Sequence, residues 1–168
     1  MRKLPKIINQ DEFEKIFKAT EKKEYKLAML LGFEAGMRIS EIVGYKDRVP
    51  ALTPDRVEEA AIRIISGKGA KDRIVPRPKR VNEAAKKMLP LKVSRRSLQK
   101  HVTDIGHKIL NKDITFHTLR HGFGSHLANA GRPIHEVQML MGHADLSTTG
   151  IYLHANPKGA VDGAREVF

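Results

Sequence analysis

Apolar residues recur at helical spacing along most of this chain, in short runs that Gly and Pro interrupt, and one central stretch departs from that pattern. Residues 62–65 and 73–75 are β-prone, and Gly67-Lys68-Gly69-Ala70 between them is typical of a hairpin turn. Helices are expected over residues 10–21, 25–34, 37–42, 81–88, 115–130 and 136–141. The pattern predicts a mainly α fold with a small antiparallel β-sheet, of the α+β class.

One more helix is expected to begin with Ser94-Arg95-Arg96-Ser97, after Pro90. Its apolar residues are predicted to share one side, and they are Leu98, Val102, Ile105 and Ile109. Thr53-Pro54 is typical of another helix start, with proline at the first helical position.

The length and composition indicate one globular domain over residues 1–168. No apolar run approaches the roughly 18 residues of a membrane span, and the N-terminus lacks the apolar core of a secretory signal. The chain has no cysteine, which excludes disulfides and thiolate metal sites. We therefore expect a cytoplasmic protein with no membrane partner.

The chain is strongly basic, since 31 Lys and Arg against 19 Asp and Glu give a formal net charge of +12. A polyanion is the expected partner, although a solvated basic surface explains the charge about as well. With three Tyr, six Phe and no Trp, the chain has little material for stacking bases. Double-stranded DNA contacted through its phosphates fits better than a single strand.

Six residues are candidates for phosphoryl transfer on DNA: Arg38, Lys68, His117, Arg120, His143 and Tyr152. They stand in the motifs G-x-R-x-S-E at residues 36–41, G-K-G-x-K-x-R at 67–73, H-x-L-R-H at 117–121 and G-H at 142–143, with Tyr152 nine residues after His143. Each motif alone is weak evidence. Their order and spacing together are specific.

In this order the motifs resemble the catalytic domain of the tyrosine recombinase family, which includes phage integrases and Xer-type recombinases. The resemblance covers nearly the whole chain and implies the tyrosine recombinase catalytic-domain fold. It also implies site-specific DNA recombination through a 3′-phosphotyrosyl intermediate, with Tyr152 as nucleophile, Lys68 as general acid and His117 as proton acceptor. Neither ATP, a cofactor nor a metal is expected, because arginine and lysine take the role that metals have elsewhere.

Arg38 and Arg120, together with His143, are expected to stabilise the phosphate. A phosphodiester under attack gathers negative charge on its nonbridging oxygens, and a guanidinium offers them a planar fork of donors. On a helix, His117, Arg120 and His121 would project from one face. His117 and His121 are also similar to a zinc-binding H-E-x-x-H pair, but Thr118 stands where the Glu would be. His121 is expected to pack structurally.

Further basic residues are candidates for DNA contact. Lys71 and Arg73, after the hairpin turn, are expected to hold phosphates. Arg95, Arg96 and Lys100 lie at the start of their helix, where a solvated basic face explains them about as well.

Family members usually carry an N-terminal DNA-clamping (core-binding) domain, and this chain begins almost directly at the catalytic domain. We therefore expect residues 1–168 to lack that domain. Residues 156–168 resemble a tail that docks on a neighbouring subunit, with Val161 and Phe168 as apolar anchors, although a frayed end is about as well supported. The resemblance implies a homotetramer on DNA, and a monomer is possible without DNA.

Two other functions are compatible with these residues. A type IB topoisomerase uses a similar constellation, but the hairpin lysine and the short chain favour recombination. A non-catalytic DNA-binding remnant of an integrase is the other alternative, and the presence of all six candidate residues argues against it.

Overall fold

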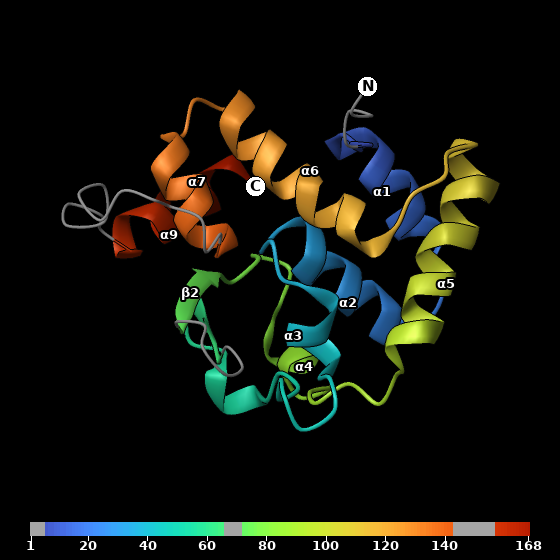
Figure 1. Cartoon of the computed structure of the whole chain (residues 1–168), viewed down its shortest axis with the longest axis horizontal. Helices are drawn as coiled ribbons and strands as arrows, with labels where there is room; N and C mark the ends of the chain where they lie inside the picture. Colours follow the sequence, from blue (N-terminus) through green and yellow to red (C-terminus); the bar gives the residue numbers. More distant parts are fainter. Residues whose placement is uncertain (1–5, 66–71, 143–156) are drawn as a thin grey trace.

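The computed structural model describes residues 6–65, 72–142 and 157–168, and in those ranges it is mainly helical with one two-stranded sheet (Figure 1). The expected fold class is confirmed. The elements are α1 (Gln10–Ala19), α2 (Lys23–Phe33), α3 (Ile39–Val43), the 3-10 turn η1 (Pro54–Arg56), β1 (Ala61–Ile64), β2 (Arg73–Pro76), α4 (Glu83–Lys86), α5 (Arg95–Ile105), the π-helical turn η2 (Gly106–Leu110), α6 (Phe116–Asn129), α7 (Ile134–Met141) and α9 (Pro157–Val167). None of these helices is both long enough and apolar enough to cross a membrane.

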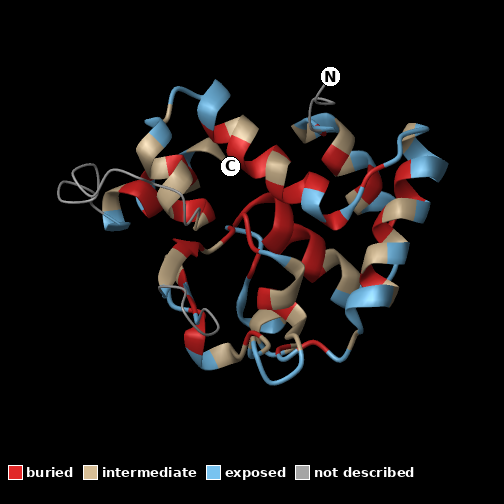
Figure 2. Ribbon diagram, in the orientation of Figure 1, coloured by how far each residue is buried: buried red, intermediate tan, exposed pale blue. Residues whose placement is uncertain are grey.

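Helix α2 lies in the centre of the main core, and residues 27–33 are all buried (Figure 2). It packs closely against α6 because glycines stand at the crossing. A Cβ on Gly122 would lie 2.7 Å from the ring of Phe33, and a Cβ on Gly32 would lie 2.8 Å from the ring of Phe116. Phe33 is fully buried and also stacks on Phe13 of α1 at 4.1 Å. The crossing thus fixes α6, which carries Arg120, relative to α1 and α2.

The expected hairpin is confirmed as an antiparallel pair, in which Ala61 is opposite Pro76 and Ile64 is opposite Arg73. Its turn, with Lys68 and Lys71, lies outside the described residues. Strand β2 packs against α7 and α9, which lie side by side (Figure 1). These elements and the second half of α6 enclose a second apolar cluster that includes Phe123, Leu140 and Val161. The sheet is therefore joined to the helices that precede and follow residues 143–156.

The C-terminal segment packs on its own chain. Val161 is 2% exposed, and the ring of Phe168 stacks on Phe123 with their centroids 5.8 Å apart. Phe168 also meets Phe33 edge-on at 5.9 Å, so it touches both apolar clusters. Both predicted anchors are in contact with the core, and docking of this tail onto a neighbouring subunit stays a prediction.

Two expectations about local structure were wrong. The helix expected over residues 81–88 is the single turn α4, because the chain leaves the helix after Lys86 and buries Leu89 and Leu91 in a segment without regular secondary structure. Ile109 does not share the buried side of α5, since it is 37% exposed. The helix changes to a π turn at Gly106, where the backbone passes the side chain of Ile114, and this change of period rotates Ile109 outward.

Truncating Phe33 tests how much the α2–α6 crossing contributes to stability. We expect Phe33→Ala to lower the free energy of unfolding by about 3–5 kcal/mol, because it leaves a cavity beneath Phe13 and beside Gly122. Phe17→Ala is the control, since Phe17 is only partly buried, and it should cost less than half as much. Urea denaturation of both variants measures the difference. Equal losses would show that the crossing is not where the stability resides.

Candidate active site

Three arginines from separate elements converge on the C-terminal end of α7. Each donates a hydrogen bond to one of three consecutive carbonyls: Arg73 Nε to the Leu140 oxygen at 2.9 Å, Arg120 to the Met141 oxygen, and Arg38 Nη2 to the Gly142 oxygen at 3.2 Å. The last carbonyls of a helix have no partner within it, and they carry the negative end of its dipole. The end of α7 therefore attracts all three guanidinium groups.

Glu41 supplies the carboxylate of this cluster, which we call the arginine cluster and define as Arg38, Glu41, Arg73 and Arg120. Its Oε1 accepts from Arg73 Nη1 at 2.6 Å and from Arg38 Nη1 at 3.0 Å. Its Oε2 accepts from Arg73 Nη2 at 3.0 Å and from the backbone N–H of Arg38 at 2.7 Å. Burial alone would raise the pKa of Glu41, but the hydrogen bonds and charges of Arg73 and Arg38 outweigh it and lower that pKa. Glu41 is therefore ionised at neutral pH.

Arg120 is 2% exposed and donates Nη1 to the Gly36 carbonyl at 2.7 Å. Burial, together with the charges of Arg38 and Arg73, lowers its pKa to about 9. It remains protonated at pH 7, so three positive groups face one carboxylate in a largely buried place. Such a site is suited to an anion, and a phosphate matches the fork of donors of an accessible guanidinium such as that of Arg38.

Gly36 allows this arrangement. Its φ is +67°, a left-handed conformation that favours glycine, and a Cβ there would lie 2.4 Å from the ring of Phe123. The tight turn at Gly36 presents its carbonyl to Arg120 and leads directly to Arg38, which precedes α3. The glycine of the G-x-R-x-S-E motif is thus explained by local geometry.

His117 and His121 lie one turn apart on α6, with their rings edge to face and 4.3 Å between centroids. His117 is exposed and His121 is half-buried. Burial and the neighbouring Arg120 charge both lower the pKa of His121, which favours its neutral form at pH 7. Within the described ranges, no group of three His, Asp or Glu side chains could hold a metal ion, so the pair has no third ligand there.

The structure describes some of the predicted catalytic residues, and others lie outside the described ranges. It brings Arg38 and Arg120 together, and His117 lies on the same helix as Arg120. Lys68, His143 and Tyr152 lie outside the described residues. Glu41 and the role of Arg73 were missed as parts of the site. Both residues stand in the sequence motifs. Their ion pair joins positions 32 residues apart, so it could be recognised only from the folded structure.

Arg73 has a different environment from the one expected of a phosphate ligand. Its side chain is 8% exposed, and its guanidinium is bound by Glu41 and the Leu140 carbonyl. In the structure it therefore supports the cluster from within, and direct contact with DNA stays a prediction.

The other predicted DNA contacts are exposed on the first half of α5. Arg95, Arg96 and Lys100 all face solvent. The guanidinium of Arg95 lies 4.4 Å from the centroid of the Tyr45 ring, and Lys100 pairs with Asp104 at 2.6 Å. These side chains can reach a polyanion without displacing any buried group.

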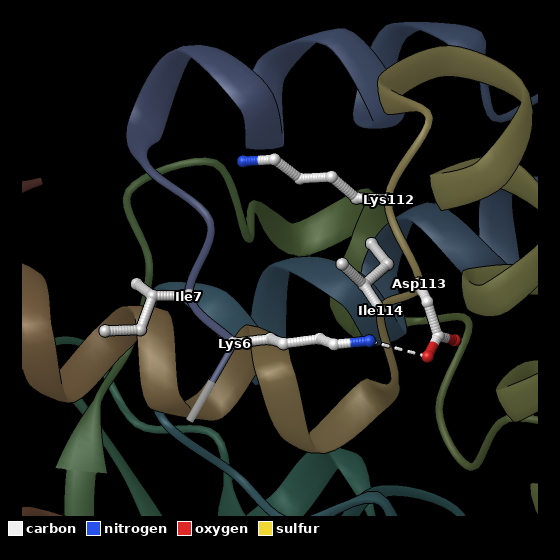
Figure 3. A pocket seen from close by; sticks show the side chains of 5 residues that line it. All are labelled: Lys6, Ile7, Lys112, Asp113 and Ile114. Carbon is white, nitrogen blue, oxygen red and sulfur yellow. Dashed lines mark hydrogen bonds and ion pairs between the residues drawn. The ribbon is translucent and has the colours of Figure 1, made fainter. Parts of the chain in front are cut away.

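A hollow of about 320 Å³ lies on another part of the surface (Figure 3). It is lined by Lys6, Ile7, Lys112, Asp113 and Ile114, and Lys6 pairs with Asp113 at 2.6 Å. Both partners of this pair are 60% exposed, so the pair contributes little to stability. None of the lining residues is a member of the arginine cluster.

Removing the charge of Glu41 tests the electrostatics of the cluster. We expect Glu41→Gln to cost about 3–5 kcal/mol of folding free energy at pH 7, because three guanidinium groups lose their buried carboxylate. The pKa of Glu41 is lowered in the fold, so its contribution is complete above the ordinary value of 4.5 and is lost as pH falls below it. The difference between wild type and variant should therefore shrink below pH 4.5.

Urea denaturation at pH 7 and at pH 4 measures this difference. Glu58→Gln is the control, since Glu58 pairs with Arg63 while both are more than half exposed, and it should cost no more than about 1 kcal/mol. A loss in Glu41→Gln as small as that of the control would contradict the account.

Comparison with known proteins agrees with the geometry. Residues 6–158 match the Phage integrase family. The chain is 32% identical over 183 residues to a tyrosine recombinase of Thermosipho africanus, which covers 99% of this chain and 63% of that protein. The chain therefore spans less than two thirds of that relative's length.

Solved structures share the fold. The integrase from mycobacterium phage Brujita aligns with a TM-score of 0.78 at 22% identity, over all of this chain and 60% of that one. The site-specific recombinase XerH, solved bound to its difH substrate, aligns with a TM-score of 0.66 at 26% identity, over 94% of this chain and 53% of that one. This chain belongs to the phage integrase family of tyrosine recombinases and has the fold of their catalytic domain.

Proposed function

We propose that this chain catalyses site-specific DNA recombination by cleaving and rejoining strands through a 3′-phosphotyrosyl bond at Tyr152. The observation that carries the proposal is the arginine cluster, in which Arg38 and Arg120 meet with an excess of positive charge. A cluster of this kind stabilises the negative charge that develops on a phosphodiester under attack. Membership of the tyrosine recombinase family supports the same reaction.

Arg38 is the residue best placed to receive the phosphate. Its side chain is 42% exposed, and two of its five N–H donors are engaged by Glu41 and the Gly142 carbonyl. The bond to Gly142 is 3.2 Å long and has a neutral acceptor. A phosphate oxygen is a stronger acceptor, because charge-assisted hydrogen bonds are shorter and stronger. Arg120 would complete the site from the buried side, and His143 would bind the phosphate with these two arginines.

The proposed reaction balances without an external energy source. The phenol oxygen of Tyr152 attacks phosphorus while the bond to the 5′ oxygen breaks. His117 accepts the tyrosine proton, and Lys68 protonates the leaving oxygen. Attack by a 5′-hydroxyl of another strand reverses these steps and restores a phosphodiester. The exposure of His117 on α6 is consistent with its giving and receiving protons at the surface of the site.

The proposed substrate is double-stranded DNA, and the related recombinase XerH is solved bound to its difH substrate. Lys71, Arg95, Arg96 and Lys100 are the proposed contacts to the DNA backbone, and we propose a homotetramer on DNA as the working assembly. Binding through phosphates should weaken steeply as salt is raised.

A covalent-adduct assay tests the nucleophile. We expect the protein to form an adduct that survives denaturing electrophoresis with a pool of nicked duplexes that carry a randomised site between fixed arms. Tyr152→Phe should form none, because it lacks the attacking oxygen, and Tyr25→Phe is the matched control. If no duplex yields an adduct, a DNA-binding module is favoured. Relaxation of plasmids that lack the recovered site would instead indicate a topoisomerase.

A sulfur substitution tests the general acid. We expect Lys68→Ala to slow cleavage at an ordinary 5′ oxygen by about 10²- to 10⁴-fold, the usual contribution of acid catalysis. A 5′-sulfur leaving group needs no proton, so the same variant should cleave that substrate at nearly the wild-type rate. Equal slowing on both substrates would remove Lys68 from this role.

A further inference from the structure

Arg73 is the first residue of β2, and it is the member of the arginine cluster that joins three elements. It contacts Glu41 on α3 and Leu140 on α7 while it is held in the sheet opposite Ile64. Its side chain is 8% exposed, whereas that of Arg38 is 42% exposed. Of the two, Arg38 is the one that an incoming phosphate can reach.

The donors of Arg73 are directed at protein groups. Nη1 and Nη2 form a two-pronged bond to the Glu41 carboxylate at 2.6 and 3.0 Å, and Nε donates to the Leu140 carbonyl at 2.9 Å. This uses three of its five N–H groups on two acceptors that lie in different directions. A lysine has one point charge and could not reproduce the pattern.

Glu41 passes this constraint on to Arg38. The same two oxygens that Arg73 binds accept the backbone N–H and Nη1 of Arg38. Without Arg73, the carboxylate would keep one partner and could turn about its side-chain bonds. Arg38 would then lose the fixed acceptor that orients its guanidinium.

Gly142 shows how closely Arg73 approaches the end of α7. A Cβ on Gly142 would lie 2.9 Å from both Cδ and Nε of Arg73, and its φ of +64° also favours glycine. The Gly142 carbonyl in turn accepts from Arg38 Nη2 at 3.2 Å. Arg73 therefore supports Arg38 from two directions, through Glu41 and through the end of α7.

We propose that Arg73 is a positioning residue, which fixes the catalytic guanidinium of Arg38 through Glu41 and the C-terminal end of α7 without contacting DNA. The inference rests on the proposed function for its consequence in catalysis. The orientation of Arg38 by Arg73 does not depend on catalysis and can be tested without DNA cleavage. It replaces direct phosphate contact as the role of this residue.

Single-turnover cleavage with saturating DNA tests the consequence, on the site recovered in the adduct assay. We expect Arg73→Lys to lower the cleavage rate constant by about 10- to 100-fold, the effect of misplacing a catalytic group by about 1 Å. The DNA dissociation constant and its salt dependence, measured by fluorescence anisotropy, should stay at wild-type values. Arg63→Lys is the matched control, because Arg63 lies on β1 with 53% exposure and pairs with Glu58. It should leave both quantities unchanged.

A direct phosphate contact would give the opposite result. Arg73→Lys would then weaken DNA binding or Arg73→Ala would reduce the salt slope by about 1, with little change in the rate at saturation. That outcome overturns the proposal, as does a wild-type rate in Arg73→Lys. Partial unfolding does not imitate positioning, because an unfolded fraction lowers the amplitude of the reaction and leaves the rate constant of the folded molecules intact.

A double-mutant cycle tests the route through Glu41. We expect Arg73→Lys combined with Glu41→Gln to cleave no more slowly than the slower single variant, because both changes release the same contact. Independent, multiplied losses would overturn the route through Glu41.

Orientation of Arg38 can be read even if the wild type forms no covalent adduct, which would be a failure of the proposed function alone. In ¹⁵N-labelled protein, the Nε–H signal of Arg38 is assigned by its loss in Arg38→Lys. We expect Arg73→Lys to shift this signal and Arg63→Lys to leave it in place. An unmoved signal in Arg73→Lys would overturn the positioning role whatever the activity.

Discussion

The C-terminal carbonyls of α7 are the acceptors around which this structure is organised. Arg73, Arg120 and Arg38 each bind one of three successive carbonyls, and they come from the sheet, from α6 and from the segment before α3. Free carbonyls at a helix end need partners, and here the partners are side chains from the rest of the domain. The end of α7 thereby fixes the relative positions of elements that are far apart in the sequence.

Apolar packing makes this convergence possible. The glycines at the α2–α6 crossing let α6 approach closely enough for Arg120 to reach the Gly36 carbonyl. The second apolar cluster holds α7, α9 and β2 together, and Phe168 joins it to the main core. The arginine cluster lies between the main core and the second apolar cluster, since Gly36 adjoins the main core and approaches Phe123 of the second cluster. The geometry of the arginine cluster therefore depends on both. A change in the packing of either apolar cluster would therefore displace the arginine side chains.

Sequence reasoning was accurate where periodicity and order decide the answer. Helices α1, α2, α6 and α7 and the hairpin follow from local spacing. The ordered motifs contain Arg38 and Arg120, which the structure brings together, and their catalytic roles stay predictions. The prediction that Ile109 is buried was wrong, because a π turn changes the helical period and no local residue pattern predicts that turn. The burial of Arg73 was not foreseen either, and its contact with DNA stays a prediction. Position in a basic motif does not distinguish a guanidinium that faces solvent from one that is buried against Glu41, since that difference arises from tertiary packing.

The charge balance of the cluster links its stability to its chemistry. Burial and the neighbouring guanidinium groups lower the pKa of Arg120 to about 9, which means that the free protein holds its positive charge against a cost. One carboxylate cannot neutralise three cations. A phosphate bound at Arg38 would supply further negative charge, and binding to the folded state stabilises it. Under the proposed function, the guanidinium groups that repel one another in the free protein would favour the pentacoordinate phosphate, whose negative charge exceeds that of the ground state. Glu41 reduces the repulsion among the three positive charges, and Arg73 holds the Glu41 carboxylate in place.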